Sequence, residues 1–407
     1  MIESIVNTIK YLITTFLIGT QTMISPVAPE RNIFIETYPN VVIENLWFEY
    51  RDKIQKDGRT IDRERNYLTT SEGQSYSLLR AVWMDDKATF DKVLTWTNNN
   101  LRKRETDKLF AWMWGQSKNG SWGIIFDEGG LNTATDADQD IALALIFASK
   151  RWNEERYIKQ AREILADIWE IEVIEIQGEP YLLAGNWAKS EAFPTINPSY
   201  FSFAAYPIFA EVDPEHDWLA LRDTSYKVLK TIQENPLEKE NTVGLPPDWV
   251  SIDPTSGEIL KASHFDKTVA FSDDAIRVPW RVALDWKWHR NPQAKEYLES
   301  LTFLQNEWTK EGKILARYAE NGTPLVTYQS NSLYGAILPA MQIVNEDLAK
   351  EIYVTKIASL YDKDLEKFHE NKDLGYYSQN WVWFGMALYE NKLLNLNNIE
   401  GITDYED

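Results

Sequence analysis

The sequence predicts an all-α protein built as a closed ring of six helical hairpins. Apolar residues recur at helical spacing through most of residues 40–395, and runs with strand-like alternation are few and short. No Pro/Gly/Ser-rich linker and no low-complexity block interrupts this stretch, which favours a single domain of residues 29–407 behind a leader. Long loops are expected at about 104–135, 171–198 and 235–272, and long loops inside a compact domain are usually functional.

Twelve helices follow from the periodicity, and they pair into the six hairpins of such a ring. A ring of this kind places its site where the N-termini of the inner helices meet the loops. Short strands are indicated at Trp122–Phe126 and Glu172–Ile176. The helices are expected near residues 41–55, 72–84, 87–103, 136–151, 153–170, 199–211, 217–234, 273–289, 293–310, 328–344, 347–369 and 379–392.

The first 28 residues have the pattern of a secretory leader. Lys10 precedes the apolar run Tyr11–Gly19, which is short for a membrane span but has the length of a signal-peptide core. Cleavage after Ala28 would place Pro26 at the −3 position, so the cleavage site is imperfect. We expect export, as a secreted, periplasmic or membrane-anchored protein. The alternative is a cytoplasmic protein whose amphipathic N-terminal helix packs on the barrel.

Composition excludes several classes of function. The chain has no cysteine, which removes disulfides, thiolate metal sites and cysteine nucleophiles. Its four histidines lack metal-ligand spacing, and a net charge of −20 disfavours nucleic acid and anionic membranes. We therefore expect no cofactor and no nucleic-acid partner. The 17 Trp and 20 Tyr fit either a large aromatic core or platforms on which sugar rings stack.

Two segments carry candidate carboxylates at helix starts. Ser71 suits an N-cap, so that Glu72 lies in the first turn and Gly73 leaves space beside it. The alternative is a glutamate that only complements the helix dipole. The second segment carries Asp136, Asp138 and Asp140. It is not an EF-hand loop, because the required Gly and Glu are missing, but an acidic first turn capped by Thr135 would explain most of it.

A third segment begins with the pair Asp273-Asp274. Adjacent helical residues point about 100° apart, so only one of the two aspartates can face a shared pocket. Arg277 follows Asp274 at i+3 and can pair with it, although a surface ion pair is the simpler alternative. A fourth segment, Asn197–Phe201 (NPSYF), opens another helix after a loop that carries Trp187.

Together these segments resemble the family-eight glycoside hydrolases. Ala134–Trp152, ATDADQDIALALIFASKRW, resembles the family's diagnostic stretch nearly residue for residue. The elements at Ser71–Gly73, Asn197–Phe201 and Asp274–Arg281 follow in the family's order, and the resemblance runs from about residue 40 to 392. It implies an (α/α)6 barrel and hydrolysis of a glycan with inversion at the anomeric carbon.

The resemblance also implies residue roles. Glu72 would be the general acid, Asp274 the general base, Asp136 the residue that holds the sugar, and Tyr200 a neighbour of the attacking water. Asp273 stands where relatives often carry an aromatic residue, which makes it a competitor for the base. The loop before Asp136 is longer than in typical members. The substrate-binding candidates are Trp112, which matches a family aromatic, with Trp114, Trp122, Trp187, Arg277 and Arg281.

The chemistry sets two further expectations. A general acid must stay protonated, whereas a helix N-terminus favours its anion, so we predict that Asp136 lies close enough to Glu72 to outweigh the dipole. Arg277 or Arg281 would keep the base ionised. We expect a monomer that cuts a polysaccharide or oligosaccharide, with β-1,4-glucan first, chitosan second and xylan oligomers third. A non-catalytic glycan-binding protein on the same barrel is the alternative of another class.

Overall fold

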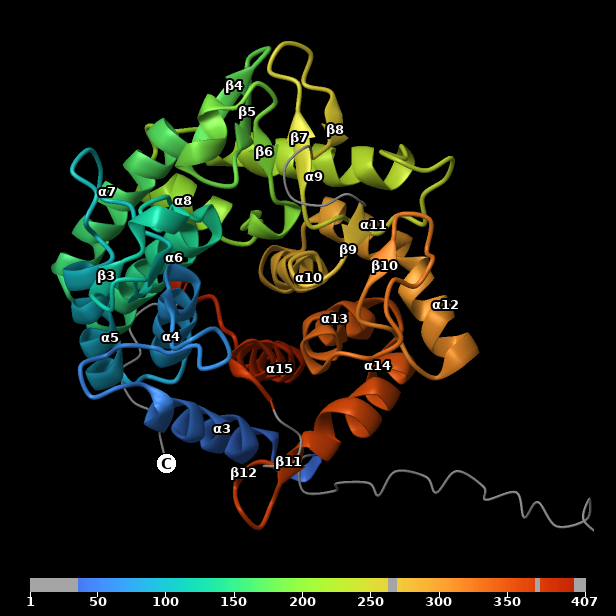
Figure 1. Cartoon of the computed structure of the whole chain (residues 1–407). Coiled ribbons are helices and arrows are strands. Elements are labelled where there is room, and N and C mark those ends of the chain that lie inside the picture. Colours follow the sequence, from blue (N-terminus) through green and yellow to red (C-terminus); the bar gives the residue numbers. More distant parts are fainter. Residues whose placement is uncertain (1–35, 263–268, 370–373, 399–407) are drawn as a thin grey trace, which may run out of the picture.

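The computed structural model describes residues 36–262, 269–369 and 374–398, in which the helices form two concentric rings (Figure 1). The inner helices pack side by side, α4 on α6, α10 on α13 and α13 on α15. The six helical hairpins close into an (α/α)6 barrel, as the sequence predicts. The inner ring contains α4 (Ser71–Trp83), α6 (Thr135–Trp152), α10 (Arg277–His289), α13 (Asn331–Val344) and α15 (Tyr376–Tyr389).

The sixth inner position is irregular. It holds the short 3-10 turn η3 (Pro198–Tyr200), which contacts both α6 and α10, and then α8 (Tyr206–Val212). The outer helices are α3 (Pro39–Lys53), α5 (Lys87–Asn100), α7 (Glu155–Glu172), α9 (Trp218–Glu234), α11 (Pro292–Ser300), α12 (Thr302–Glu311) and α14 (Glu346–Ile352).

The inner ring is closed most tightly where α13 crosses α15. A Cβ atom on Gly335 would lie 2.4 Å from the carbonyl oxygen of Trp381, and one on Gly385 would lie 2.0 Å from that of Gly335. Only glycine permits this approach of two helix backbones. Large aromatic side chains, among them Trp381 and Trp383, fill the space around the crossing and are almost fully buried.

Prolines account for two differences from the predicted helices. The expected helix at 199–211 is α-helical only from Tyr206, because Pro207 is tolerated in the first turn and not deeper. The expected helix at 273–289 begins at Arg277 for the same reason, since Pro279 must lie in its first turn.

Two other predicted helices are too long. The segment 293–310 is two helices that meet at Leu301. The segment 347–369 leaves the α-helix at Ile352 and ends in a hairpin of β11 (Tyr361–Asp362) and β12 (Lys367–Phe368). In this hairpin the Asp362 side chain accepts the backbone N–H groups of Asp364 and Leu365, a turn that competes with the helix.

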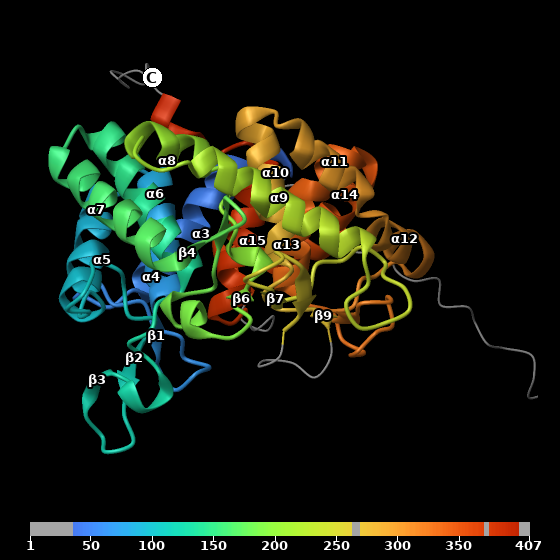
Figure 2. The ribbon, with the colours of Figure 1, turned by 90° about the horizontal axis from the view of Figure 1, so that it is seen from above.

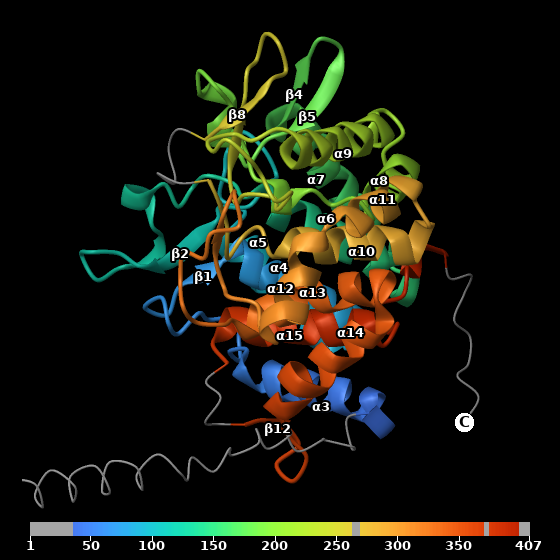
Figure 3. The same ribbon diagram turned by 90° about the vertical axis from the view of Figure 1, so that its right-hand side faces the viewer.

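The long loops form small antiparallel sheets, which sequence periodicity indicated only in part. Their strands are β1 (Thr69–Thr70), β2 (Met113–Gln116), β3 (Trp122–Ile124), β4 (Val173–Ile176), β5 (Glu179–Leu182), β6 (Thr195–Ile196), β7 (Val250–Ile252), β8 (Ile259–Lys261), β9 (Ala270–Phe271) and β10 (Tyr318–Ala319). Figure 2 shows β1 to β3 projecting from one end of the barrel, and Figure 3 shows the same end on the left. Because β1 runs directly into α4, this is the end at which the inner helices begin.

The predicted leader, residues 1–28, lies outside the described residues. Within the described part of the chain, no helix has the length and apolar character needed to cross a membrane. The boundary between a leader and a domain of residues 29–407 therefore stays a prediction.

Candidate active site

Glu72 lies in the first turn of α4, at the end of the barrel that carries the loops. The N-cap is Thr70, whose hydroxyl accepts the Gly73 N–H at 3.0 Å, so the helix begins at Ser71 rather than after it. Gly73 makes room for Tyr376, because a Cβ atom there would lie 2.8 Å from the Tyr376 hydroxyl. That hydroxyl donates to Oε1 of Glu72 at 3.2 Å. The side chain of Glu72 remains 24% exposed, enough to meet a ligand.

Arg277, in the first turn of α10, joins the candidate carboxylates. Its Nη1 contacts Oε2 of Glu72 at 3.0 Å and Oδ2 of Asp136 at 2.9 Å. Its Nη2 contacts Oδ1 of Asp274 at 2.6 Å, as the i+3 spacing predicts. Residues separated by up to 205 positions thus meet at one buried guanidinium. We call Glu72, Asp136, Asp274 and Arg277 the Arg277 cluster.

The NPSYF segment contributes two further groups to this cluster. Ser199 accepts a hydrogen bond from Nη2 of Arg277 at 2.7 Å, and the ring of Tyr200 lies 5.2 Å from the guanidinium carbon. The backbone carbonyl of Tyr200 accepts from Nε2 of Gln139 on α6 at 2.8 Å. The break in the sixth inner helix therefore brings Tyr200 next to Arg277, and its predicted position near the attacking water remains a prediction.

The three aspartates of α6 are all buried, and Asp136 and Asp138 lie in its first turn as the acidic-turn interpretation expects. The predicted cap is wrong, because the N-cap is Ala134 and the hydroxyl of Thr135 donates to the Leu183 carbonyl. Asp136 contacts Arg277. Asp138 accepts the backbone N–H of Phe110 at 3.0 Å, and Asp140 forms a bidentate pair with Arg281 at 2.6 and 2.8 Å. Three aspartates spaced two residues apart in the sequence thus make three different kinds of contact.

The paired aspartates point in different directions. Asp273 is exposed, and its backbone carbonyl accepts a hydrogen bond from the Tyr377 hydroxyl. Asp274 turns inward to Arg277 and keeps 30% of its side chain exposed. Of the two, Asp274 therefore shares the site with Glu72.

Burial raises the pKa of Glu72 to about 7. Arg277 opposes this shift, while the charges of Asp136 and Asp274 add to it. Asp136 does act in the predicted direction, but it is not the main cause, because loss of solvent outweighs the neighbouring charge. Burial likewise raises the pKa of Asp136. Three carboxylates around one cation leave an excess of negative charge, which favours retention of a proton near neutral pH.

The aromatic candidates differ in how much ring they present. Trp122 is 49% exposed and stacks at 5.4 Å on Trp114, while Arg59 lies over both rings. Trp114 also meets the edge of Trp96. Trp114 therefore supports Trp122, and the predicted part of both residues in substrate binding remains a prediction.

Two more aromatics of the prediction lie in the loops at the same end. Trp112 is half-buried, and its Nε1 donates to the Gly129 carbonyl at 3.0 Å. Trp187 is half-buried in the 3-10 turn η2 (Asn186–Ser190). The predicted part of both residues in substrate binding remains a prediction.

Arg281 is 5% exposed and pairs with Asp140. Its predicted part in substrate binding remains a prediction. Sequence reasoning also assigned no role to Ser199, Tyr376 and Asp248. Ser199 was inside a recognised motif, whereas Tyr376 and Asp248 lie in segments without a distinctive spacing.

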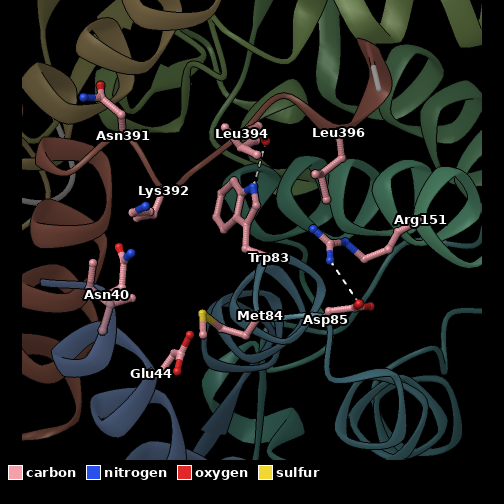
Figure 4. A pocket seen from close by; sticks show the side chains of 11 residues that line it. Asn40, Glu44, Trp83, Met84, Asp85, Arg151, Asn391, Lys392, Leu394 and Leu396 are labelled. Carbon is pink, nitrogen blue, oxygen red and sulfur yellow. Dashed lines mark hydrogen bonds and ion pairs between the residues drawn. The ribbon is translucent and has the colours of Figure 1, made fainter. Parts of the chain in front are cut away.

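A cavity at the other end of the barrel is distinct from this cluster. It measures about 420 Å³ and lies where α4 ends, beside Trp83, Met84 and Asp85 (Figure 4). Asp85 pairs with Arg151 at 3.3 Å, and the Trp83 indole donates to the Leu394 carbonyl. Its wall carries opposite charges and shows no convergent carboxylates. In the described part of the chain, no group of three or more acidic or histidine side chains has a metal-binding arrangement.

The helices form an (α/α)6 barrel, and its loop-bearing end brings Glu72, Asp136 and Asp274 together on Arg277. The model of the family "Glycosyl hydrolases family 8" matches residues 39–361, and the chain belongs to this family. Endoglucanase A of Acetivibrio thermocellus is 30% identical over 334 residues, 81% of this chain and 62% of that relative. The chain thus spans about three fifths of the length of the curated relatives that it matches.

Solved structures agree in fold. The endo-1,4-D-glucanase of Vibrio fischeri ES114 has a TM-score of 0.69 at 26% identity, over 85% of this chain and 94% of that one. The apo β-1,3-1,4-glucanase of Paenibacillus sp. X4 has a TM-score of 0.70 at 20% identity, over 88% of this chain and 93% of that one. These likenesses confirm the predicted (α/α)6 barrel.

Proposed function

We propose that this protein is an inverting, endo-acting glycoside hydrolase that cleaves β-1,4-glucan, with Glu72 as general acid and Asp274 as general base. The observation that carries the proposal is Arg277, which holds both carboxyl groups on separate nitrogens of one guanidinium. The relatives named endoglucanase support the choice of substrate.

The two carboxyl groups have environments suited to different roles. Glu72 has a pKa of about 7, so a substantial fraction carries a proton for the leaving oxygen near neutral pH. Asp274 contacts Arg277 at 2.6 Å, which favours its ionised form as a base for water. An inverting enzyme keeps its two carboxyl groups ~6.5–9.5 Å apart to admit that water. Arg277 contacts both carboxyl groups, and the ring of Tyr200 lies 5.2 Å from its guanidinium carbon.

The exposed face of Trp122 on the projecting sheet supports the proposal that the substrate is a polymer. Indole faces stack on sugar rings, and a polymer that occupies several subsites needs such platforms beyond the cleavage point. We expect Trp122→Ala to raise KM about tenfold with kcat within a factor of about three, the pattern for loss of uniform binding. Leu325→Ala, a substitution at another exposed apolar residue, is the matched control.

The decisive experiment compares reducing-sugar release from carboxymethylcellulose, lichenan, chitosan and xylan. Turnover of the first two, with little on the others, is expected. Turnover of chitosan alone would instead indicate a chitosanase, whose acidic surface attracts a cationic polymer. Proton NMR of the first product should show the α-anomer, and an initial β-anomer would overturn inversion. Binding without turnover on all four substrates would favour a glycan-binding protein.

We also propose export and a monomeric state, both carried over from the sequence. Mass spectrometry of the mature N-terminus tests the leader, and an intact Met1 in the cytosolic fraction would contradict export. Size-exclusion chromatography with light scattering tests the monomer against the 47.3 kDa of the full chain.

A further inference from the structure

Asp248 is a buried carboxylate that the proposed reaction does not use directly. It lies in the loop before β7 and is 5% exposed. Its backbone N–H donates to the Ala270 carbonyl at 2.9 Å, which ties this loop to β9. β9 in turn leads directly into the segment Ser272–Ile276 that carries the paired aspartates.

The side chain of Asp248 binds the backbone of that segment. Its Oδ1 accepts the N–H groups of Ser272 at 3.2 Å, of Asp274 at 3.1 Å and of Ala275 at 2.8 Å. Its Oδ2 accepts the hydroxyl of Ser272, which also receives a hydrogen bond from Arg317 at 3.1 Å. One oxygen thus satisfies three backbone donors ahead of α10, where no helix carbonyl is available to them.

We propose that Asp248 is a positioning residue, which holds the turn 272–275 in the one conformation that presents Asp274 to the cleft and Asp273 to solvent. The inference rests on the proposed function of Asp274 and extends it. A side chain follows its backbone, so a turn that slipped by one residue would exchange the two aspartates. Three hydrogen bonds to one fixed oxygen prevent that slip.

The hydrogen bonds do not require the charge of Asp248. Burial and the nearby Asp274 carboxylate raise the pKa of Asp248 to about 7. In the neutral acid Oδ1 still accepts the three N–H groups, and the other oxygen donates to the Ser272 hydroxyl. Asparagine offers the same acceptor and donor in nearly the same shape. Alanine offers neither.

The test is a pair of variants at this position. Asp248→Ala should lower kcat at least about tenfold with KM within about threefold, because substrate binds while the base is displaced. Asp248→Asn should keep kcat within about threefold of the wild type. Equal loss in both variants, or a folded Asp248→Ala with wild-type kcat, would overturn the proposal.

Glu320 provides the matched control. It is 4% exposed and also accepts three backbone N–H groups, those of Leu237, Glu238 and Lys239, in another loop. Glu320→Ala should lower Tm as Asp248→Ala does, yet leave kcat within about threefold when assayed below its Tm. A similar loss of kcat in Glu320→Ala would show that loop stability, not positioning, is responsible.

A crystal structure of Asp248→Ala separates this inference from the proposed function. If the wild type releases no product from any of the four polymers, the proposed function fails. The structure still reports whether the turn 272–275 has moved and whether Asp274 has left Arg277. An unmoved turn would refute the positioning role whatever the activity, and if Asp248→Ala does not fold, the crystal structure of Asp248→Asn must show the turn intact.

Discussion

Two buried arginines lie one helical turn apart on α10 and face two aspartates one turn apart on α6, yet their surroundings differ in charge. Arg281 and Asp140 form a bidentate pair in which one positive charge meets one negative charge. Arg277 contacts Asp136, and in addition Glu72 and Asp274. Both arginines are buried, so burial alone does not distinguish the two contacts.

The difference teaches which buried charges are structural. A matched pair balances its own charge and joins two inner helices, and it leaves no excess charge for a ligand to meet. Three carboxylates on one guanidinium repel one another, and the site accommodates them by retaining a proton on Glu72. A fold gains no stability from such an excess, which supports the proposal that the Arg277 cluster is the active site.

The largest expected effect is on activity, when Glu72 of the Arg277 cluster and Asp140 of the matched pair are each replaced by the neutral amide. Glu72→Gln should lower kcat on β-1,4-glucan about 10³-fold, because general acid catalysis is worth about 10²–10⁴-fold. Circular dichroism should be unchanged. Asp140→Asn should lower Tm and keep kcat within about tenfold below its Tm. If Asp140→Asn lost as much activity as Glu72→Gln, the comparison between a working cluster and a structural pair would fail.

The next effect is on stability, at the matched pair. Arg281→Met should lower the free energy of unfolding by about 3–5 kcal/mol, because it leaves the Asp140 carboxylate buried and alone. Urea unfolding checks this. The double variant Asp140→Leu with Arg281→Met should recover most of the loss, since replacing a buried pair by apolar side chains is often neutral. A double variant no more stable than Arg281→Met would show that the pair is needed for more than charge balance.

A smaller effect is expected in the pH dependence of stability. Burial raises the folded-state pKa of Glu72 from 4.5 to about 7. Below pH 4.5 Glu72 is protonated in both states and costs nothing. As the pH rises from 4.5 to 7 the unfolded chain loses this proton first, so stability falls. Glu72→Gln should therefore be more stable than the wild type by about 1–3 kcal/mol at pH 8.

Calorimetry at pH 4 and pH 8 measures that difference. The two proteins should have nearly equal Tm at pH 4, and the inactive variant should have the higher Tm at pH 8. If the two proteins had equal Tm at pH 4 and at pH 8, burial of ionised Glu72 would cost the wild type no stability. The charges of the Arg277 cluster would then be as well balanced as those of Arg281 and Asp140.

The sequence predicts the barrel better than it predicts the site. Helical periodicity and four motif segments predict the ring. They also single out Glu72, Asp136 and Asp274, because these residues lie at helix starts or just before them in a recognisable order. The pairing of Arg281 with Asp140 was not predicted, because spacing on one helix does not reveal which partner a second helix supplies. Asp248 was missed because its partners are backbone N–H groups 24 to 27 positions away, which leave no mark on composition.

The smallest expected effect concerns Tyr376, which contacts the Arg277 cluster and carries no charge of its own. Its hydroxyl donates to Oε1 of Glu72 and stabilises the anion. Tyr376→Phe should therefore raise the pKa of Glu72 further and move the alkaline limb of kcat/KM upward by about 0.5–1 pH unit. The reason is that a hydrogen bond to the carboxylate is worth about 1.5–3 kcal/mol and one to the neutral acid only about 0.5–1.5 kcal/mol. Tyr377→Phe is the matched control, because that hydroxyl donates to the Asp273 carbonyl instead. A limb that stays in place in Tyr376→Phe, or moves equally in Tyr377→Phe, would mean that the limb does not report Glu72, and the assignment of the general acid would lose its support from pH.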